Sequence, residues 1–453
     1  MNVFHASSRF SALIGPVAAL LLALLLGSCG GKAASDQVPA GLSAFAGDGQ
    51  VIITFNQNPA YQYWVFGANS PSISTSTWFN LPGAKFVTPA YSPQIVSGLS
   101  NTVGLYSFVM NTTLNGSPAG GDSAVVSATP RLAGDYWYDY SRQGGLSSTT
   151  NLNATAVSSN VYLAVGSGGA IYTSIDLYGA GALGTHPTWT AQASNVTNNL
   201  NSVIWNGVSF VAAGDHATVV SSDDAVNWTV YTGLVFHLAA GGTVPDATTV
   251  KINSITELSG TFVIATSDAS GGSQALYTSA DLINWTQQGA AVVSSTRNVN
   301  AIVTVNGSLV ALADGGVYYT SSDAITWVAR TIASTPNQPI GSTQNLRAVT
   351  FSPTLALYVA VGDGPALFTS PDLINWRAAS SVPSSASNLR GVLFSTRFMA
   401  VGDSGTALYS DDGYNWYAPQ TKAPPAMSTL RGLQFCLGAY VAVGDGGTLT
   451  VSY

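Results

Sequence analysis

Residues 388–416 read NLRGVLFSTRFMAVGDSGTALYSDDGYNW, and this stretch decides the fold because it recurs. Residues 345–376 run through the same order of motifs: Asn-Leu-Arg, then Val-Gly-Asp, then Ser-x-Asp, then Asn-Trp. Seven copies follow one another from residue 151 onwards, and the seventh stops at Ser452-Tyr453 without an Asp turn and a Trp. Tandem copies of about 40 to 50 residues are typical of β-propellers and solenoids.

Each copy predicts four antiparallel strands, because short apolar runs alternate with turns of Gly, Asp and Asn. The ending that the seventh copy lacks stands before the first copy, at Asp135-Tyr136-Trp137-Tyr138. A strand missing at one end and supplied at the other closes a ring, which removes open sheet edges. We therefore predict a seven-bladed β-propeller over residues 135–453, in which residues 135–144 complete the last blade.

The composition indicates an all-β, exported protein. Of 453 residues, 8% are charged, 46% are hydrophobic and 47 are glycine. Glu257 is the single glutamate among 21 acidic residues, and Asp favours turns where Glu favours helices. The formal net charge is −7 and no basic stripe is present, so nucleic acid is not expected as a partner.

Residues 1–28 have the organisation of an export signal. Arg9 supplies a positive flank, residues 18–26 are apolar but too short to span a bilayer, and Leu26-Gly27-Ser28-Cys29 follows. This segment resembles a bacterial lipoprotein signal. The resemblance implies that Cys29 carries lipid, that residues 29–37 form a tether, and that the protein is anchored to a membrane of the bacterial cell envelope. An ordinary secretory signal with an incidental cysteine is the alternative.

Two further expectations concern single residues. Gly30 follows Cys29 where an Asp would otherwise stand, which by the same resemblance implies the outer membrane. The second cysteine, Cys436, lies in a predicted strand and is expected to be a small buried hydrophobe.

Residues 38–130 are predicted to form a separate β domain. They open with Pro39-Ala40-Gly41-Leu42 and Gly47-Asp48-Gly49, place Leu99 ahead of Tyr106, and close with Val126-Ser127-Ala128-Thr129-Pro130. These features resemble a fibronectin type III module, which implies a β-sandwich. The spacing from Leu99 to Tyr106 is one residue longer than in the usual tyrosine corner, and Phe55 stands where many members have Trp. Residues 70–93 are rich in loop-forming residues.

The Ser-x-Asp-x-x-x-Trp turns predict a structural role for their aspartates. A carboxylate at this position accepts hydrogen bonds from backbone N–H groups of its own turn, while the Trp packs against the sheet. The turn resembles the Asp-box, or bacterial neuraminidase repeat, in a form one residue shorter. By that resemblance it lies on the face opposite the ligand site. The aspartates with this spacing are Asp224, Asp281, Asp323, Asp372 and Asp412, and Asp176 of the first copy stands in Ser174-Ile175-Asp176 with an insertion before Trp189. The whole repeat is similar to propellers of the photosystem II stability/assembly factor type, whose members are assembly or binding proteins.

One position early in the first strand of every copy is polar, and we predict that its side chains form a ring at one mouth of a central channel. These residues are Asn153, Asn201, Asn253, Asn300, Arg347, Arg390 and Arg431. The turn after the second strand, on the same face, carries Ser167, Asp215, Asp314, Asp363, Asp403 and Asp445. In one interpretation each Arg pairs with an Asp and each Asn bonds to a turn backbone, locking blade to blade. In the other, the three arginines bind a carboxylate or sulfate.

Linkers between copies provide a second candidate surface on that face, since loops carry function more often than blades. Residues 234–237 (Leu-Val-Phe-His) form an apolar patch that either contacts a partner or packs onto the domain.

The preferred interpretation is a non-catalytic cell-envelope lipoprotein whose propeller loop face binds a protein or glycan partner, with a dedicated assembly factor as a variant. A sialidase-like or other glycan-active hydrolase is the alternative. Against it, the three arginines share one repeat position, a Phe/Tyr-Arg-Ile-Pro motif is missing, and Glu257 has no Tyr beside it. His186, His216 and His237 lack metal-ligand spacing, so no metal or cofactor is expected. The oligomeric state stays open.

Overall fold

The computed structural model describes most of the chain, in two compact units: residues 37–131 and residues 132–452. The described ranges are 37–113, 120–141, 146–147, 149–158, 161–175, 188–244, 246–268, 274–290, 292–293, 297–332, 344–420, 428–436 and 438–452. Strands predominate in both units, and the helical segments described are single 3-10 turns of three residues. The expected lipidation site at Cys29 and the turn of Asp176 lie outside the described residues.

The first unit consists of two antiparallel sheets around one core. One sheet has the order β1 (Ser43–Gly47), β2 (Gln50–Thr54), β5 (Gln94–Ser97); the other has β4 (Lys85–Ala90), β3 (Gln62–Ala68), β6 (Tyr106–Thr113), β7 (Val126–Ala128). The core includes Phe55 and Tyr63, whose ring centroids are 4.8 Å apart. The hydroxyl of Tyr106 accepts a hydrogen bond from the Ser100 N–H at 3.4 Å. Within the stretch expected to be loop, residues 70–93 contain β4 and the 3-10 turn η1 (Trp78–Asn80).

The described part of the second unit contains seven sheets in chain order. The first is β9 (Leu152–Val157), β10 (Tyr162–Gly166), β11 (Ile171–Ser174), β12 (Thr190–Gln192), and the second is β13 (Leu200–Trp205), β14 (Phe210–Gly214), β15 (Thr218–Ser222), β16 (Thr229–Val230). The third is β18 (Val250–Leu258), β19 (Thr261–Asp268), β20 (Gln274–Ser279), β21 (Asn284–Gln288) and β17 (Val235–His237). The fourth is β22 (Val299–Val305), β23 (Ser308–Ala313), β24 (Val317–Ser321), β25 (Val328–Thr331).

The remaining sheets repeat this plan with two variations. The fifth is β26 (Leu346–Ser352), β27 (Leu357–Gly362), β28 (Leu367–Ser370), β29 (Arg377–Ala378). The sixth is β30 (Leu389–Phe394), β31 (Phe398–Gly402), β32 (Ala407–Ser410), where a single bridge from Tyr409 to Tyr417 stands in place of a fourth strand. The seventh is β33 (Leu430–Cys436), β34 (Ala439–Gly444), β35 (Thr448–Ser452) and β8 (Trp137–Asp139). The 3-10 turns are η2 (Ser167–Gly169), η3 (Ala247–Thr249), η4 (Asp314–Gly316), η5 (Asp403–Gly405) and η6 (Asp445–Gly447).

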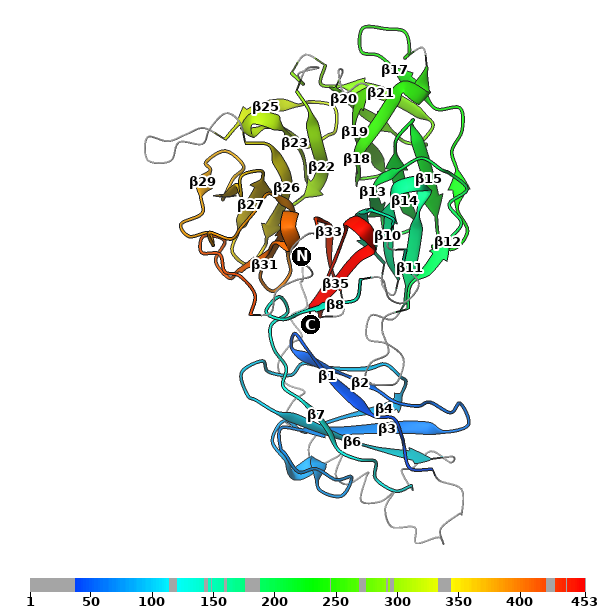
Figure 1. Ribbon diagram of the computed structural model, residues 1–453, viewed down its shortest axis with the longest axis vertical. Coiled ribbons are helices and arrows are strands. Elements are labelled where there is room, and N and C mark those ends of the chain that lie inside the picture. The colour runs from blue at the N-terminus through cyan, green and yellow to red at the C-terminus, as the bar shows by residue number, and fades with distance from the viewer. Residues whose placement is uncertain are drawn as a thin grey trace, which may run out of the picture. The chain divides into compact units, whose positions relative to one another are not determined.

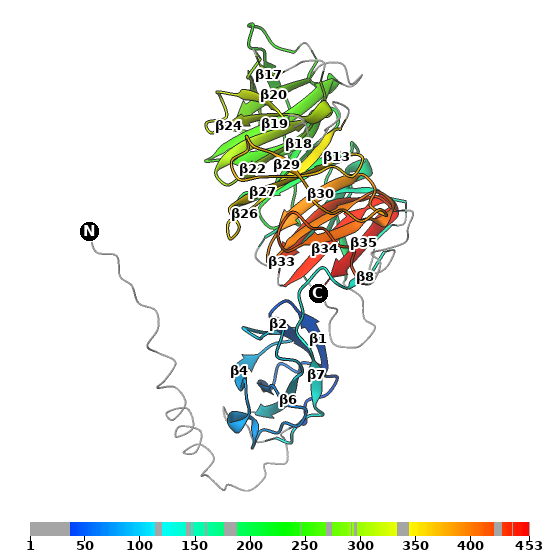
Figure 2. The same ribbon diagram turned by 90° about the vertical axis from the view of Figure 1, so that its left-hand side faces the viewer.

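These sheets are arranged in a circle, which is the architecture of a β-propeller (Figure 1). The first strand of each sheet contacts the first strand of the next, and β33 of the seventh sheet contacts β9 of the first. The seventh sheet is completed by β8, which runs antiparallel to β35 with Trp137 opposite Ser452 (Figure 2). The Gly134 N–H also donates to the Ser452 Oγ at 2.8 Å, so the two ends of the unit are joined by backbone and side-chain bonds.

A buried arginine ties the segment before β8 to the sixth sheet. The Arg397 Nε and Nη2 donate to the two carboxylate oxygens of Asp411 at 2.8 and 2.9 Å, and Nη1 donates to Asp135 at 2.6 Å. The guanidinium carbon lies 4.0 Å from the centroid of the Tyr409 ring, and only 5% of the Arg397 side chain is exposed. A charge this deeply buried requires such partners. Asp135, which precedes β8 of the seventh sheet, is therefore held to the sixth sheet.

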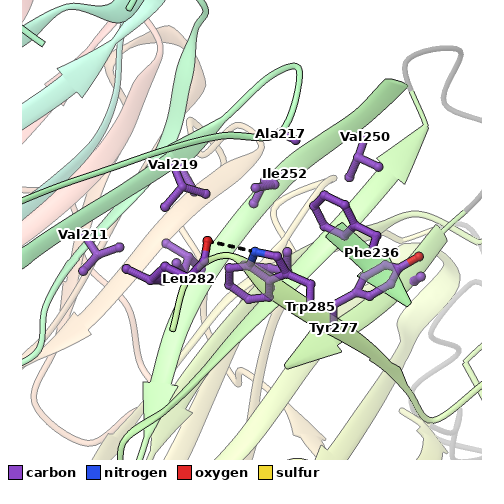
Figure 3. Packing of buried hydrophobic residues seen from close by; sticks show 13 residues of the cluster. Val211, Ala217, Val219, Phe236, Val250, Ile252, Tyr277, Leu282 and Trp285 are labelled. Atoms are coloured by element: carbon purple, nitrogen blue, oxygen red, sulfur yellow. Dashed lines mark hydrogen bonds between the residues drawn. The ribbon is translucent and has the colours of Figure 1, made fainter. Parts of the chain in front are cut away.

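The apolar patch at residues 234–237 packs onto the third sheet. It forms β17, which pairs in parallel with the outer strand β21. Phe236 is 1% exposed and lies between the rings of Trp285 and Tyr277, at centroid distances of 6.4 and 5.2 Å (Figure 3). Of the two alternatives for this patch, the structure therefore shows packing.

Replacement of Trp137 by Ala tests the closure of the ring. Trp137 is 5% exposed, pairs with Ser452 and donates its indole N–H to the Gly134 carbonyl at 3.1 Å. We expect Trp137→Ala to lower the free energy of unfolding of the repeat unit by about 3 to 5 kcal/mol, as for other large core truncations. Chemical denaturation followed by fluorescence measures it.

The matched control is Tyr138→Ala, because Tyr138 is the next residue of the same strand and is 42% exposed. It should cost much less. Equal effects of the two substitutions would contradict closure through β8.

Candidate functional site

The seven polar residues of the predicted ring, here called the collar residues, occupy β-bulges. In the fifth sheet Leu346 lies opposite Gly362 and Ala348 lies opposite Val361, so that Arg347 is the extra residue. The same shift occurs at the equivalent residue of the other six sheets. A bulge re-aims the side chain of its extra residue, so the collar residues leave the regular alternation of the strand.

The Val-Gly motif follows from the close approach of two backbones at this bulge. A Cβ built on Gly402 would lie 1.9 Å from the carbonyl oxygen of Asn388, and that oxygen accepts the Asp403 N–H at 2.9 Å. Equivalent contacts below 2.2 Å occur at Gly166, Gly214, Gly362 and Gly444. The fourth sheet carries Ala313 here, with φ −132° and ψ 176° where Gly402 has −172° and −153°. A side chain at this position therefore requires a different backbone.

The three collar arginines each form a two-pronged ion pair with the aspartate that follows the second strand of the same sheet. In every pair Nε and Nη2 of the guanidinium donate to Oδ1 and Oδ2 of the carboxylate. The pairs are Arg347–Asp363 at 3.1 and 2.7 Å, Arg390–Asp403 at 2.9 and 2.8 Å, and Arg431–Asp445 at 2.7 and 3.0 Å.

The Nη1 atoms of the arginines and the Nδ2 atoms of the collar asparagines make the contacts between neighbouring sheets. The Arg347 Nη1 donates to the Asn300 Oδ1 at 2.9 Å, and the Arg390 Nη1 lies 4.0 Å from the Asp363 Oδ1. The collar asparagines donate to carbonyls of the next sheet: Asn153 to Leu200, Asn201 to Ile252, Asn253 to Val299 and Asn300 to Leu346, at 2.9 to 3.3 Å. These carbonyls belong to first strands, not to the turns expected from the sequence.

A second set of residues, the bridging asparagines, also joins neighbouring sheets and was not recognised from the sequence. They are Asn151, Asn199, Asn345 and Asn388, two positions before a collar residue. The Oδ1 atom of Asn388 accepts the Gly364 N–H of the preceding sheet at 2.9 Å, and its Nδ2 donates to Asp403 at 2.9 Å. Asn151 accepts the Gly446 N–H at 3.0 Å and so joins the seventh sheet to the first. The triplet Asn-Leu-Asn/Arg recurs in these copies, and this recurrence could have indicated a shared role for its first asparagine.

The ion pairs set the electrostatics of the collar. The hydrogen bond from Arg390 lowers the pKa of Asp403 and outweighs the opposing effect of burial. Burial raises the pKa of Asp363, but the hydrogen bond and charge of Arg347 lower it further, so that the net direction is also down. Each arginine already has its bidentate edge occupied by an aspartate carboxylate, which favours the pairing interpretation over an anion pocket.

Arg431 differs from the other two arginines. Its side chain is 39% exposed, against 25% for Arg347 and 27% for Arg390. Its Nη1 has no hydrogen-bond partner among the described residues, whereas the Nη1 of Arg347 bonds to Asn300. The Nη1 of Arg390 makes only the 4.0 Å contact to Asp363, so Arg431 is distinguished by combining an unused Nη1 with the greatest exposure of the three.

The predicted Asp turns lie at the other end of the sheets, because they follow the third antiparallel strand. In the second sheet, Asp224 Oδ1 accepts the N–H groups of Val226 and Asn227 at 2.8 and 2.7 Å, and the Ser222 hydroxyl at 3.0 Å. Trp228 donates its indole N–H to the Ala225 carbonyl at 3.3 Å. Asp281, Asp323, Asp372 and Asp412 accept the same set of bonds.

Other candidates from the sequence have local roles or differ from expectation. The Glu257 carboxylate accepts the Gly260 N–H in its own turn. Cys436 is half-exposed at the end of β33, so the expectation that it is buried is wrong; the last residue of a strand is not covered on both faces. Within the described ranges, no group of three His, Cys, Asp or Glu residues could hold a metal ion, and His186 lies outside them. The same ranges contain no helix suited in length and apolarity to crossing a membrane.

Comparisons with known proteins identify related folds. No family model matches the chain, and no curated protein does. A solved structure of YCF48 bound to D1 peptide is 17% identical with a TM-score of 0.49, covering 71% of this chain and 98% of that one. YCF48 from Cyanidioschyzon merolae is 16% identical with a TM-score of 0.49, over 70% and 98%. A catalytically inactive virginiamycin B lyase from Staphylococcus aureus with quinupristin is 9% identical, with a TM-score of 0.51 over 70% and 98%, which shows a likeness of fold alone.

The glycine at the bulge provides one prediction. We expect Gly402→Ala to lower the free energy of unfolding by about 1 to 3 kcal/mol, because the new methyl group would overlap the Asn388 carbonyl. The control is Gly391→Ala in the neighbouring strand, where the nearest atom to an added Cβ is 3.4 Å away. Urea denaturation of both variants measures the loss in free energy of unfolding. A larger loss for Gly391→Ala than for Gly402→Ala would contradict the close approach.

The collar ion pairs predict a pH dependence. The pKa of Asp403 is lowered in the folded state, so the pair stabilises at pH values above the ordinary carboxyl pKa of about 4 and loses this contribution as pH falls through the lowered value. We expect Arg390→Gln to cost about 1 kcal/mol near neutral pH and progressively less below pH ~4. Urea denaturation near neutral pH and below pH ~4 measures this difference in free energy of unfolding. Arg377→Gln, at an exposed position, is the control. A difference that persists unchanged in acid would contradict the pairing.

Proposed function

We propose that this protein is a non-catalytic lipoprotein of the bacterial cell envelope, held in the outer membrane by lipid at Cys29. In this proposal the seven sheets are the blades of a seven-bladed β-propeller, whose collar face binds a protein partner. The contacts that run from each first strand to the next, and from β33 back to β9, support the blade count. The sequence of residues 26–29 supports the anchor.

Between the anchor and the propeller we propose a fibronectin type III-like domain over residues 38–130. Its support is the strand order: β1-β2-β5 in one sheet and β4-β3-β6-β7 in the other, which is a sandwich of three and four antiparallel strands. The bond from the Ser100 N–H to the hydroxyl of Tyr106 is a further point in favour, since a tyrosine at this corner bonds back to upstream backbone.

The main support for the binding proposal is that the charged side chains at the collar are both partly exposed and already ordered by ion pairs. The three collar arginines and the aspartates that they pair with are partly exposed and are held in fixed geometry by ion pairs. A surface whose side chains are already ordered loses little conformational entropy when a partner docks. Arg431 combines the greatest exposure of the three arginines with an unused Nη1, and arginine is enriched among residues that dominate protein interfaces.

The same pairs count against a sialidase-like hydrolase. An arginine triad that binds a substrate carboxylate needs guanidinium edges open to that carboxylate, and here each edge is occupied by an aspartate of the same sheet. Binding of an anion in this way would first have to break three ion pairs. A protein partner that contacts the outer Nη1 groups and the surrounding turns requires no such rearrangement.

Cross-linking in the native envelope, followed by identification of the captured partner, tests the proposal. We expect Arg431→Ala to reduce capture of the principal partner about tenfold or more, as for an interface hot spot. Arg377→Ala is the control, because Arg377 is exposed beside Tyr414 at the Asp-turn end of the sheets. Equal capture by wild type and Arg431→Ala, or turnover of a glycoside substrate that Arg431→Ala abolishes, would refute it.

A further inference from the structure

A cavity lies at the Asp-turn end of the propeller, between the fourth and fifth sheets. Its volume is about 390 Å³, and its wall combines polar side chains with the apolar Val328 and Leu373. Asp323, Ser322, Thr326 and Arg330 come from the fourth sheet and Asp372 comes from the fifth. The cavity is at the opposite end of the strands from the collar, so it is independent of the surface proposed above for the protein partner. Its size falls in the range of small-molecule sites.

The Asp turn of the fourth sheet differs from the other turns in the hydrogen bonding of one atom, the Oδ2 of Asp323. In the other four described turns an asparagine three residues after the aspartate donates its Nδ2 to Oδ2, at 2.7 to 2.8 Å. Thr326 occupies that position in the fourth sheet, and its hydroxyl assists the carboxylate without replacing the amide bond. The Oδ2 of Asp323 therefore keeps capacity to accept a hydrogen bond, and Asp323 is one of the residues that line the cavity.

Arg330 is a second departure from the repeat. In the third sheet the equivalent cross-strand pair is neutral: the Gln288 Nε2 donates to the Thr278 Oγ1 at 3.0 Å. In the fourth sheet the Arg330 Nε makes the same bond to the Thr320 Oγ1 at 3.3 Å. Among the described residues neither Nη1 nor Nη2 of Arg330 has a hydrogen-bond partner. A guanidinium group thus borders the cavity with its terminal donors unused.

The chemistry of the wall selects the kind of ligand. An anion would meet the carboxylates of Asp323 and Asp372, and a cation would meet the guanidinium of Arg330. A neutral molecule with neighbouring hydroxyl groups meets both requirements, because each hydroxyl donates to a carboxylate oxygen and accepts from a guanidinium N–H. The hydroxyls of Ser308 and Ser322 add further donors and acceptors. We propose that this cavity is a binding site for a neutral saccharide.

The decisive variant is Thr326→Asn. It restores the asparagine of the other turns, whose Nδ2 would donate to the Oδ2 of Asp323, so we expect the melting temperature to stay the same or rise while saccharide affinity falls about tenfold or more. A loss of binding without a loss of stability separates a site from a merely structural residue. Arg330→Gln complements it, since Gln keeps the bond to Thr320, as Gln288 does to Thr278, and removes the terminal donors.

The experiment uses the purified chain without its signal and ligand-observed NMR with glucose, galactose, mannose, N-acetylglucosamine and maltose at millimolar concentration. Asn227→Thr makes the reverse exchange in the second sheet and should leave binding unchanged. Arg431→Ala should also leave it unchanged, which distinguishes this site from the collar. Absence of binding of every saccharide to the wild type, or wild-type affinity in both Thr326→Asn and Arg330→Gln, would overturn the proposal.

Discussion

One close approach of two backbones recurs in five of the seven sheets of the repeat unit. The carbonyl of the residue before the first strand lies against the Cα of the glycine that ends the second strand, as at Asn388 and Gly402. No side chain fits between these two backbones. The first strand has a bulge here, and the bulge re-aims the collar residue. The N–H of the following aspartate, Asp403, donates to the same carbonyl, and its carboxylate accepts the hydrogen bonds of the collar arginine. The position of the polar groups at this end is thus a consequence of packing in the backbone.

The two ends of the sheets satisfy their polar groups in different ways. At the collar end, bonds run from sheet to sheet: from collar asparagines to carbonyls of the next sheet, and from turn N–H groups to bridging asparagines. At the Asp-turn end, four described aspartates spend both oxygens inside their own turn, so neighbouring sheets are free to differ there. A departure such as Thr326 therefore alters the local surface without disturbing the circle.

The parts of the structure that the sequence predicted are those that repeat. The pairing of the collar arginines with aspartates could be anticipated because Arg and Asp recur at the same two positions of the last three copies, on one face, and β8 could be placed because Trp137 is the displaced member of a periodic series. Arg397 has no counterpart in the other copies, and its partner Asp135 is 262 residues away, so no repeat pattern indicated this contact. The parallel pairing of β17 and the register shift at the bulges could not be predicted from the sequence either, because both depend on neighbours in three dimensions and not on residue type.

The junction of β8 with β35 also governs the order of events during biosynthesis. The bond from Gly134 to Ser452 joins residues 318 positions apart, so the seventh sheet is completed only after nearly the whole unit has been made. Contacts of such long sequence separation form slowly, because the entropy of closing the loop is lost before the contact is gained. A nascent chain interrupted before β33 presents an unpaired β8 and a β9 without its contacts to the seventh sheet, which proteases and chaperones can recognise. The ring thus gives the cell a physical criterion for distinguishing finished from unfinished molecules.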